Sequence, residues 1–303
     1  MVMNNPLNSW LTIFLAIVIC LGSLTKKTFA DDICEPCKSL DGFVSPDKIS
    51  REIRLMVGKV GFKCSSVIFG EASCRSLISE AVEIQERRGV TETGLETDFG
   101  QSKNCPEIDS ETWAKDYSYK RPWLALHKGV DIPQPEGTAV LAIADGTVVG
   151  KFVNEGNRKG IEVMLRHLPE QTGLPFWTYS QYTHLFDLPK LPIGHTVKMG
   201  DIIGETSNTG KMGRRERRDA LHFAILYSEV PDWTNTNRAV IPRDGYWMDP
   251  IAFYREQPPY DSEALKSLPS SQKEIFIPHI RGNGTLTSKH TKRIWPYRCE
   301  EHS

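Results

Sequence analysis

The segment AVLAIADGTVVGKFV, residues 139–153, decides the fold class because it holds two runs of β-favouring residues joined at Asp145-Gly146. An Asp-Gly pair between such runs is a strong signal for a β-hairpin turn. Several short strands with turn residues between them predict a mainly β domain, an antiparallel sheet or sandwich. Further runs of this kind, separated by Gly, Pro and Asn clusters, are GIEVMLRH (160–167), FWTYSQYTHL (176–185), TVKMGDIIGET (196–206) and LHFAILYS (221–228).

The rest of the chain divides around this β domain, which we place at residues 118–255. Residues 31–117 predict a small helical N-terminal region that contains cysteines. Residues 256–303 are rich in Pro, Ser and Lys and predict an extended C-terminal tail, whose end Cys299 would pin back to the body.

Two helices are expected in the N-terminal region. Ser45-Pro46 is typical of an N-cap followed by proline at the first helical position, and it leads into residues 47–59. A second helix is expected over about 73–88, where Gly89 would end it.

Residues 1–30 predict a signal peptide or an N-terminal anchor. The apolar run at 11–24 is shorter than a membrane span of about 20 residues, and Thr28-Phe29-Ala30 resembles a cleavage site. However, no Lys or Arg precedes the run, and Lys26-Lys27 follow it, so an uncleaved anchor is the alternative. We therefore expect a periplasmic or secreted protein, or one anchored in a membrane and facing the periplasm.

Cysteine usage supports export. Removal of residues 1–30 leaves an even number of cysteines, which in an exported chain indicates disulfides. Cys34 and Cys37 have the spacing of a redox pair or of half a zinc site, but no second CxxC follows them, so we favour a structural disulfide. The remaining cysteines are Cys34, Cys37, Cys64, Cys74, Cys105 and Cys299.

The charge balance restricts the partner class. The 303 residues carry 37 Lys and Arg against 38 Asp and Glu, a formal net charge of −1. Nucleic-acid binders usually show a strong basic excess, so we expect no nucleic acid as partner.

Three residues form a candidate metal site. His127 and Asp131 are four residues apart, so an extended segment would place them on one face, and His222 would complete a tripod. Zinc is commonly bound by imidazole nitrogen and carboxylate oxygen, and a catalytic site keeps one position for water. His184 is a fourth histidine in the same β domain.

The segment 127–255 resembles the lysostaphin-type zinc endopeptidases, the LytM-like domains that cut peptidoglycan cross-bridges. The motifs that carry the resemblance occur in the family's order over somewhat less than half of the chain. They are HKGVD (127–131), TAVLAIADGTVV (138–149), YTHL (182–185), VKMGDIIGETSNTG (197–210), LHF (221–223) and MDP (248–250).

This resemblance implies one Zn²⁺ per chain, held by His127, Asp131 and His222. It also implies that His184 is a catalytic histidine, acting as a base or stabilising the oxyanion. The expected function is that of an exported zinc metalloendopeptidase that hydrolyses peptide bonds in peptidoglycan stem peptides or cross-bridges.

One position departs from the family. Its last motif is usually His-x-His, with a catalytic first histidine, but this chain has Ala220-Leu221-His222. Loss of a general acid–base group typically costs about 10²–10⁴-fold in rate. The alternative function is therefore a zinc-retaining LytM-like module with weak or no activity that binds cell wall or regulates a partner wall hydrolase. The residues weighed as substitutes for the missing histidine are Asp219, His167 and His195, the two histidines being expected at the surface or in loops.

Overall fold

The computed structural model describes residues 33–57, 80–102, 104–108, 117–118, 126–154, 159–210 and 218–300. The predicted signal peptide or anchor lies outside these residues. In the described part of the chain, no helix is both long and apolar enough to cross a membrane.

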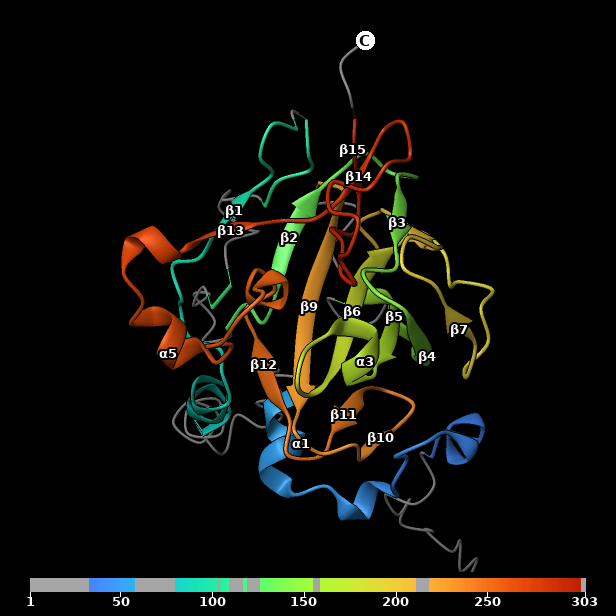
Figure 1. The fold of residues 1–303 in the computed structure, drawn as a ribbon. Helices are drawn as coiled ribbons and strands as arrows, with labels where there is room; N and C mark the ends of the chain where they lie inside the picture. Colours follow the sequence, from blue (N-terminus) through green and yellow to red (C-terminus); the bar gives the residue numbers. More distant parts are fainter. Residues whose placement is uncertain are drawn as a thin grey trace, which may run out of the picture.

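An antiparallel sheet of seven strands forms the centre of the molecule (Figure 1). The strand order is β12-β9-β6-β5-β4-β7, and β2 pairs with β9 beyond the end of β12. This confirms the predicted mainly β, antiparallel fold. The strands are β2 (Val130–Pro133), β4 (Gly146–Asn154), β5 (Gly160–His167), β6 (Trp177–Leu185), β7 (Thr196–Val197), β9 (Ala220–Ser228) and β12 (Tyr246–Met248).

The predicted hairpin at Asp145-Gly146 is wrong. β3 (Ala139–Leu141) pairs with β8 (Ile202–Glu205) in a separate two-stranded sheet, whereas β4 pairs with β5 and β7. The Asp145 carboxylate accepts hydrogen bonds from the Met199 backbone N–H, at 2.9 Å, and from Lys198 Nζ, at 2.8 Å. These bonds tie the corner to the turn between β7 and β8, so the chain passes from one sheet to the other there.

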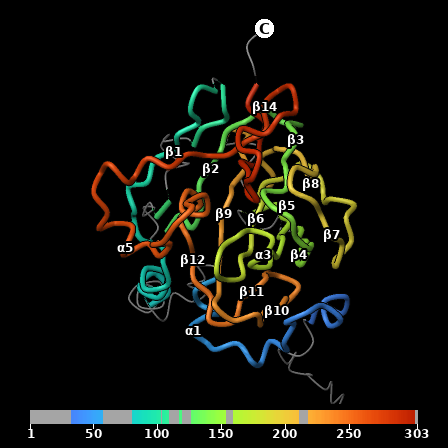
Figure 2. Tube along the Cα trace, in the orientation of Figure 1, coloured from blue at the N-terminus to red at the C-terminus, as the bar shows by residue number. Residues whose placement is uncertain are grey.

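The N-terminal segment runs past β10 (Trp233–Asn235) and β11 (Val240–Pro242), as the blue tube in Figure 2 shows. The Trp233 N–H donates to the Gly42 carbonyl, and the Val44 N–H donates to the Trp233 carbonyl. The predicted helices are present over shorter ranges: α1 covers part of 47–59, and residues 80–87 are helical within 73–88, whose beginning lies outside the described residues. Within residues 33–57, which the structure describes, the elements are the 3₁₀ helices η2 (Glu35–Ser39) and η3 (Pro46–Lys48) and helix α1 (Arg51–Val57).

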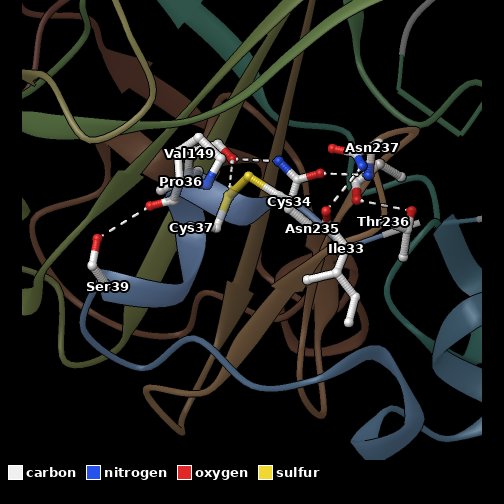
Figure 3. Close-up of a disulfide and its surroundings, with 10 residues drawn as sticks. Ile33, Cys34, Pro36, Cys37, Ser39, Val149, Asn235, Thr236 and Asn237 are labelled. Carbon is white, nitrogen blue, oxygen red and sulfur yellow. Dashed lines mark hydrogen bonds between the residues drawn. A yellow bond between two sulfur atoms is a disulfide. The ribbon is translucent and has the colours of Figure 1, made fainter. Parts of the chain in front are cut away.

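A disulfide joins Cys34 to Cys37 at the start of this segment (Figure 3). Both cysteines are buried, and Cys37 Sγ lies 3.8 Å from the Val149 carbonyl oxygen. That oxygen also accepts a 2.7 Å hydrogen bond from Asn235 Nδ2. Because reactive cysteines need exposure, this burial favours a structural role over a redox one.

The C-terminal segment is a packed part of the body, where the sequence predicted an extended tail. Trp295 is fully buried, donates from Nε1 to the Pro106 carbonyl at 2.7 Å and lies 6.3 Å from the Phe223 ring, centroid to centroid. As predicted, Cys299 pins the end back, through a disulfide to Cys105. The reason is that buried apolar side chains alternate with the prolines and lysines, namely Ile275, Ile277, Ile294, Trp295 and Tyr297.

Short elements give this segment its shape. β13 (Glu274–Phe276) pairs in parallel with β1 (Glu96–Asp98), so it crosses to the N-terminal region (Figure 1). The remaining described elements are α3 (Pro169–Thr172), η5 (Ala252–Tyr254), α5 (Ser262–Lys266), η6 (Ser270–Gln272), β14 (Ile280–Arg281) and β15 (Arg298–Cys299).

Candidate metal centre

The β2–β9 pairing brings the predicted metal ligands together. Asp131 and His222 are direct cross-strand partners, so their side chains project on the same face of the sheet. His127 precedes β2, and its Nε2 lies 3.0 Å from His222 Nδ1 and 3.3 Å from Asp131 Oδ1. His222 Nδ1 lies 2.8 Å from the same carboxylate oxygen. Residues 95 positions apart in the sequence thus converge on one point.

The convergence point is largely closed to solvent. His127 is 1% exposed, Asp131 is 5% exposed, and the His222 side chain is 17% exposed. Burial by itself raises the pKa of the Asp131 carboxyl, but the charge of His127 and the hydrogen bonds from His127 and His222 outweigh it. The pKa of Asp131 is therefore held well below its ordinary range, and this carboxylate is anionic at neutral pH.

The donor set fits a zinc ion. Two imidazole nitrogens and one carboxylate oxygen are ligands that zinc prefers, and three protein ligands are typical of a catalytic site. Zinc bonds of about 2.0–2.2 Å place tetrahedral ligand atoms about 3.3–3.6 Å apart. The observed separations of 2.8, 3.0 and 3.3 Å are close to this range.

His184 reaches this site because β6 contains a β-bulge. The β5–β6 register pairs Ile161 with Leu185 and Glu162 with Thr183, which leaves His184 as the extra residue. Its φ is +69°, a left-handed conformation that costs a non-glycine residue about 1–3 kcal/mol. Bulges of this kind re-aim a side chain. Here the His184 ring lies 6.1 Å from the His222 ring, centroid to centroid.

A hydrogen bond sets the tautomer of His184. Its Nδ1 lies 3.0 Å from the Thr209 carbonyl oxygen, which only accepts, so Nδ1 carries the proton. In the neutral ring, Nε2 then carries the lone pair of a proton acceptor. This geometry would allow His184 to accept a proton beside the candidate metal ligands.

Ala220 stands where the family's other histidine would project. It begins β9 two residues before His222, so both side chains share a face, and it pairs with Pro133. Asp219 precedes it, on the alternate side of a regular strand. His195 is exposed before β7, as expected.

The expectation for His167 is wrong, because it is a fully buried residue at the end of β5. Its Nδ1 lies 2.7 Å from the Asp145 carbonyl oxygen, and its Nε2 lies 2.7 Å from Ser180 Oγ. Burial lowers the pKa of His167 to about 4. Its side chain points to the sheet face opposite His222, so it does not replace the missing imidazole.

Glu162 and Thr183 were missed by the sequence reasoning. Both are fully buried, and they occupy neighbouring positions on the same sheet face as His222. The available signal was the single acidic residue within the otherwise apolar run GIEVM at 160–164.

Comparison with known proteins identifies the class of this region. Residues 125–235 match the family model described as Peptidase family M23. This match confirms the resemblance found in the sequence, because this part of the chain is similar to the M23 metallopeptidases.

Similar individual proteins share this region. An uncharacterized metalloprotease of Haemophilus influenzae is 42% identical over 84 residues, which are 28% of this chain and 16% of that protein. The chain thus matches about a sixth of the length of this curated relative. Among solved structures, LytU is 26% identical, with 55% of this chain and 94% of that chain covered and a TM-score of 0.34. The catalytic domain of lysostaphin from Staphylococcus simulans is 23% identical, with 46% and 86% covered and a TM-score of 0.33.

Proposed function

We propose that this protein is a zinc metalloendopeptidase that hydrolyses peptide bonds in peptidoglycan stem peptides or cross-bridges. The observation that carries the proposal is the convergence of His127, Asp131 and His222 within an M23 domain. We also propose that each chain binds one zinc ion at this site.

In this proposal His127 Nε2, Asp131 Oδ1 and His222 Nδ1 hold the metal. Zinc would supply Lewis-acid chemistry, because it polarises a carbonyl and lowers the pKa of water to about 7. Asp131 contributes the negative charge, and its partners keep it ionised. His184 accepts a proton at Nε2, while its Nδ1–H remains bonded to Thr209.

A second candidate function follows from Ala220. A methyl group neither transfers a proton nor donates to an oxyanion, so the same domain would then bind cell wall or regulate a partner wall hydrolase. This module would retain zinc, because the three ligands are intact.

A peptidoglycan digestion assay separates the two functions. Protein lacking residues 1–30 is incubated with purified wall in the presence of zinc, with chelator, and as the His222→Ala variant, and the products are identified by mass. His195→Ala is the matched control, since His195 is exposed and directly precedes β7, which lies across the sheet from β9 in the strand order. Cross-links cleaved only by zinc-loaded wild type and control support the peptidase, and the masses identify the bond. An intact wall with one zinc per chain supports the binding module.

We further propose export to the periplasm or the exterior, or anchorage in a membrane through residues 1–30. The disulfides present among the described residues, Cys34–Cys37 and Cys105–Cys299, support an oxidising compartment. Fractionation of cells, followed by N-terminal sequencing of the purified protein, tests this. A protein beginning near Asp31 indicates cleavage, and an intact N-terminus in the membrane fraction indicates an anchor.

A further inference from the structure

A row of polar residues crosses the central sheet beside the candidate metal centre. The registers pair Asp131 with His222, His222 with Thr183, and Thr183 with Glu162. Directly paired residues project on the same face, so these four side chains share one face. Adjacent strands lie about 4.8 Å apart, which places the Glu162 backbone roughly 10 Å from that of His222.

The Glu162 carboxylate is incompletely satisfied. Glu162 is fully buried, and Lys159 Nζ lies 3.0 Å from Oε2 as an ion-pair partner. Neither Oε1 nor Oε2 has a hydrogen bond of good geometry within the described residues. Leaving such an atom unpaired costs about 1–3 kcal/mol, more for a charged group, so buried polar atoms of this kind call for an explanation.

Thr183, the partner of Glu162 on the adjacent strand, also has an unsatisfied side-chain oxygen. Its Oγ1 is buried and has no hydrogen-bond partner in the described part of the chain. Glu162 and Thr183 are directly paired across β5 and β6, so three acceptor oxygens belong to neighbouring side chains on one face: Oε1, Oε2 and Oγ1. A primary ammonium group carries three N–H donors, which matches this number.

The position suits a substrate group near the scissile bond. An extended peptide advances about 3.3 Å per residue, so roughly 10 Å corresponds to about three residues from the metal ligands. The Lys159 side chain is 30% exposed whereas Glu162 is fully enclosed, so an incoming cation would reach the carboxylate by displacing Lys159. The Lys159 carbonyl also accepts the His184 N–H, so this segment adjoins the candidate base.

We propose that Glu162 and Thr183 form a subsite for a primary ammonium group of the peptide substrate, and that Lys159 is the resident cation this group displaces. The proposal rests on the proposed function, since it takes the ligand to be a wall peptide. Exchange of one ammonium for another keeps the buried carboxylate neutralised throughout, and the incoming group satisfies atoms that Lys159 leaves unpaired.

Calorimetric titration of the full chain in excess chelator measures binding without turnover. The probe is a stem-type tetrapeptide with a free α-amine and a lysine at its third position. Two further peptides carry an acetyl group on the lysine side chain or on the α-amine. Acetylation of the recognised amine should weaken binding about tenfold or more, which also identifies which amine is bound. Equal affinities, or no binding of the unblocked peptide, would overturn the proposal.

Two substitutions give opposite expectations. Glu162→Gln removes the negative charge and should weaken binding of the unblocked peptide about tenfold, whereas Lys159→Gln removes the competitor and should strengthen it severalfold. A purely structural ion pair predicts shifts of the same sign in both variants, since each breaks the same pair. Glu229→Gln and Lys190→Gln, at exposed positions, are the matched controls.

Hydrolysis of intact wall with added zinc separates failure of this proposal from failure of the peptidase. If the wall is cleaved and all three peptides bind with equal affinity, the subsite proposal is wrong and the proposed peptidase function stands. If the wall stays intact but peptide binding depends on the free amine, the proposed peptidase function is wrong and the subsite belongs to a wall-binding module.

Discussion

Two buried polar sites, one on each face of the central sheet, differ in how far their ionisable side chains are paired. On one face, His167 has both ring nitrogens within 2.7 Å of acceptor or hydroxyl oxygens, and it sits in the core. On the other face, Glu162 and Thr183 are equally buried but have unsatisfied oxygens, and they neighbour the metal ligands. The paired His167 imidazole needs no ligand, whereas the unsatisfied Glu162 carboxylate, beside the candidate metal ligands, is retained at a cost that a bound ligand would offset.

The largest expected effect is on the face that carries the metal ligands. His222→Ala removes one of three protein ligands, and a bound metal supplies several kcal/mol of transition-state stabilisation, so wall hydrolysis should fall about 1000-fold or more. Metal content, measured by mass spectrometry after desalting, should fall with it. The comparison breaks if the variant retains both stoichiometric zinc and wild-type activity.

His184→Ala should have the next largest effect. Removal of a general base typically costs about 10²–10⁴-fold, so kcat should fall by about 1000-fold. Zinc content should stay unchanged, because His184 is not among the converging ligand atoms. This difference from His222→Ala distinguishes a proton acceptor from a ligand. Loss of zinc in the His184 variant would contradict the assigned role.

These two histidines differ in how far sequence alone could place them. His222 lies within a predicted strand, and simple alternation puts it on the face of Asp131 once β2 and β9 pair. Thr183 pairs with His222 and projects on its face, so simple alternation would place the next residue, His184, on the opposite face. The β-bulge, in which His184 has a φ of +69°, turns the His184 ring toward His222. No local residue pattern predicts this bulge. The family resemblance, not periodicity, identified this residue.

The fold shows the same division. The runs at 160–167 and 221–228 match β5 and β9 within a residue, since long apolar alternation is a local property. The hairpin prediction at Asp145 was wrong because the hydrogen-bond partners of Asp145, Lys198 and Met199, are more than 50 positions away in the sequence. The C-terminal segment was predicted to be an extended tail because its composition is dominated by residues such as proline and lysine, although it contains buried residues such as Trp295. Long-range partners, which composition does not encode, decided both cases.

The role of His167, on the sheet face opposite His222, is tested by the pH dependence of the free energy of unfolding. His167 has a pKa of about 4 in the folded protein against about 6.5 when unfolded, so the unfolded chain binds more protons between these values. Its contribution to stability is present above pH 6.5 and is lost as the pH falls toward 4, a decrease of about 3 kcal/mol.

Urea unfolding at pH 7 and pH 4 measures this loss. In His167→Gln the difference in unfolding free energy between the two pH values should shrink by about 3 kcal/mol, although the variant is less stable at neutral pH. His195→Gln, at an exposed position, should keep the wild-type difference. An unchanged difference in the His167 variant would mean that this imidazole is not held neutral by burial.

The smallest expected effect comes from restoring the histidine that this chain lacks. Ala220 shares the strand face of His222, so Ala220→His projects an imidazole toward the site, and a new acid–base group should raise kcat by about tenfold or more. The gain is smaller than the loss in His184→Ala, because Ala220 is buried and its surroundings are packed around a methyl group. Leu221→Ile, on the opposite face, is the control for disturbance of β9. A rate that falls while zinc content stays constant would mean that the space beside His222 already belongs to the substrate, and that the alanine is part of how this site recognises it.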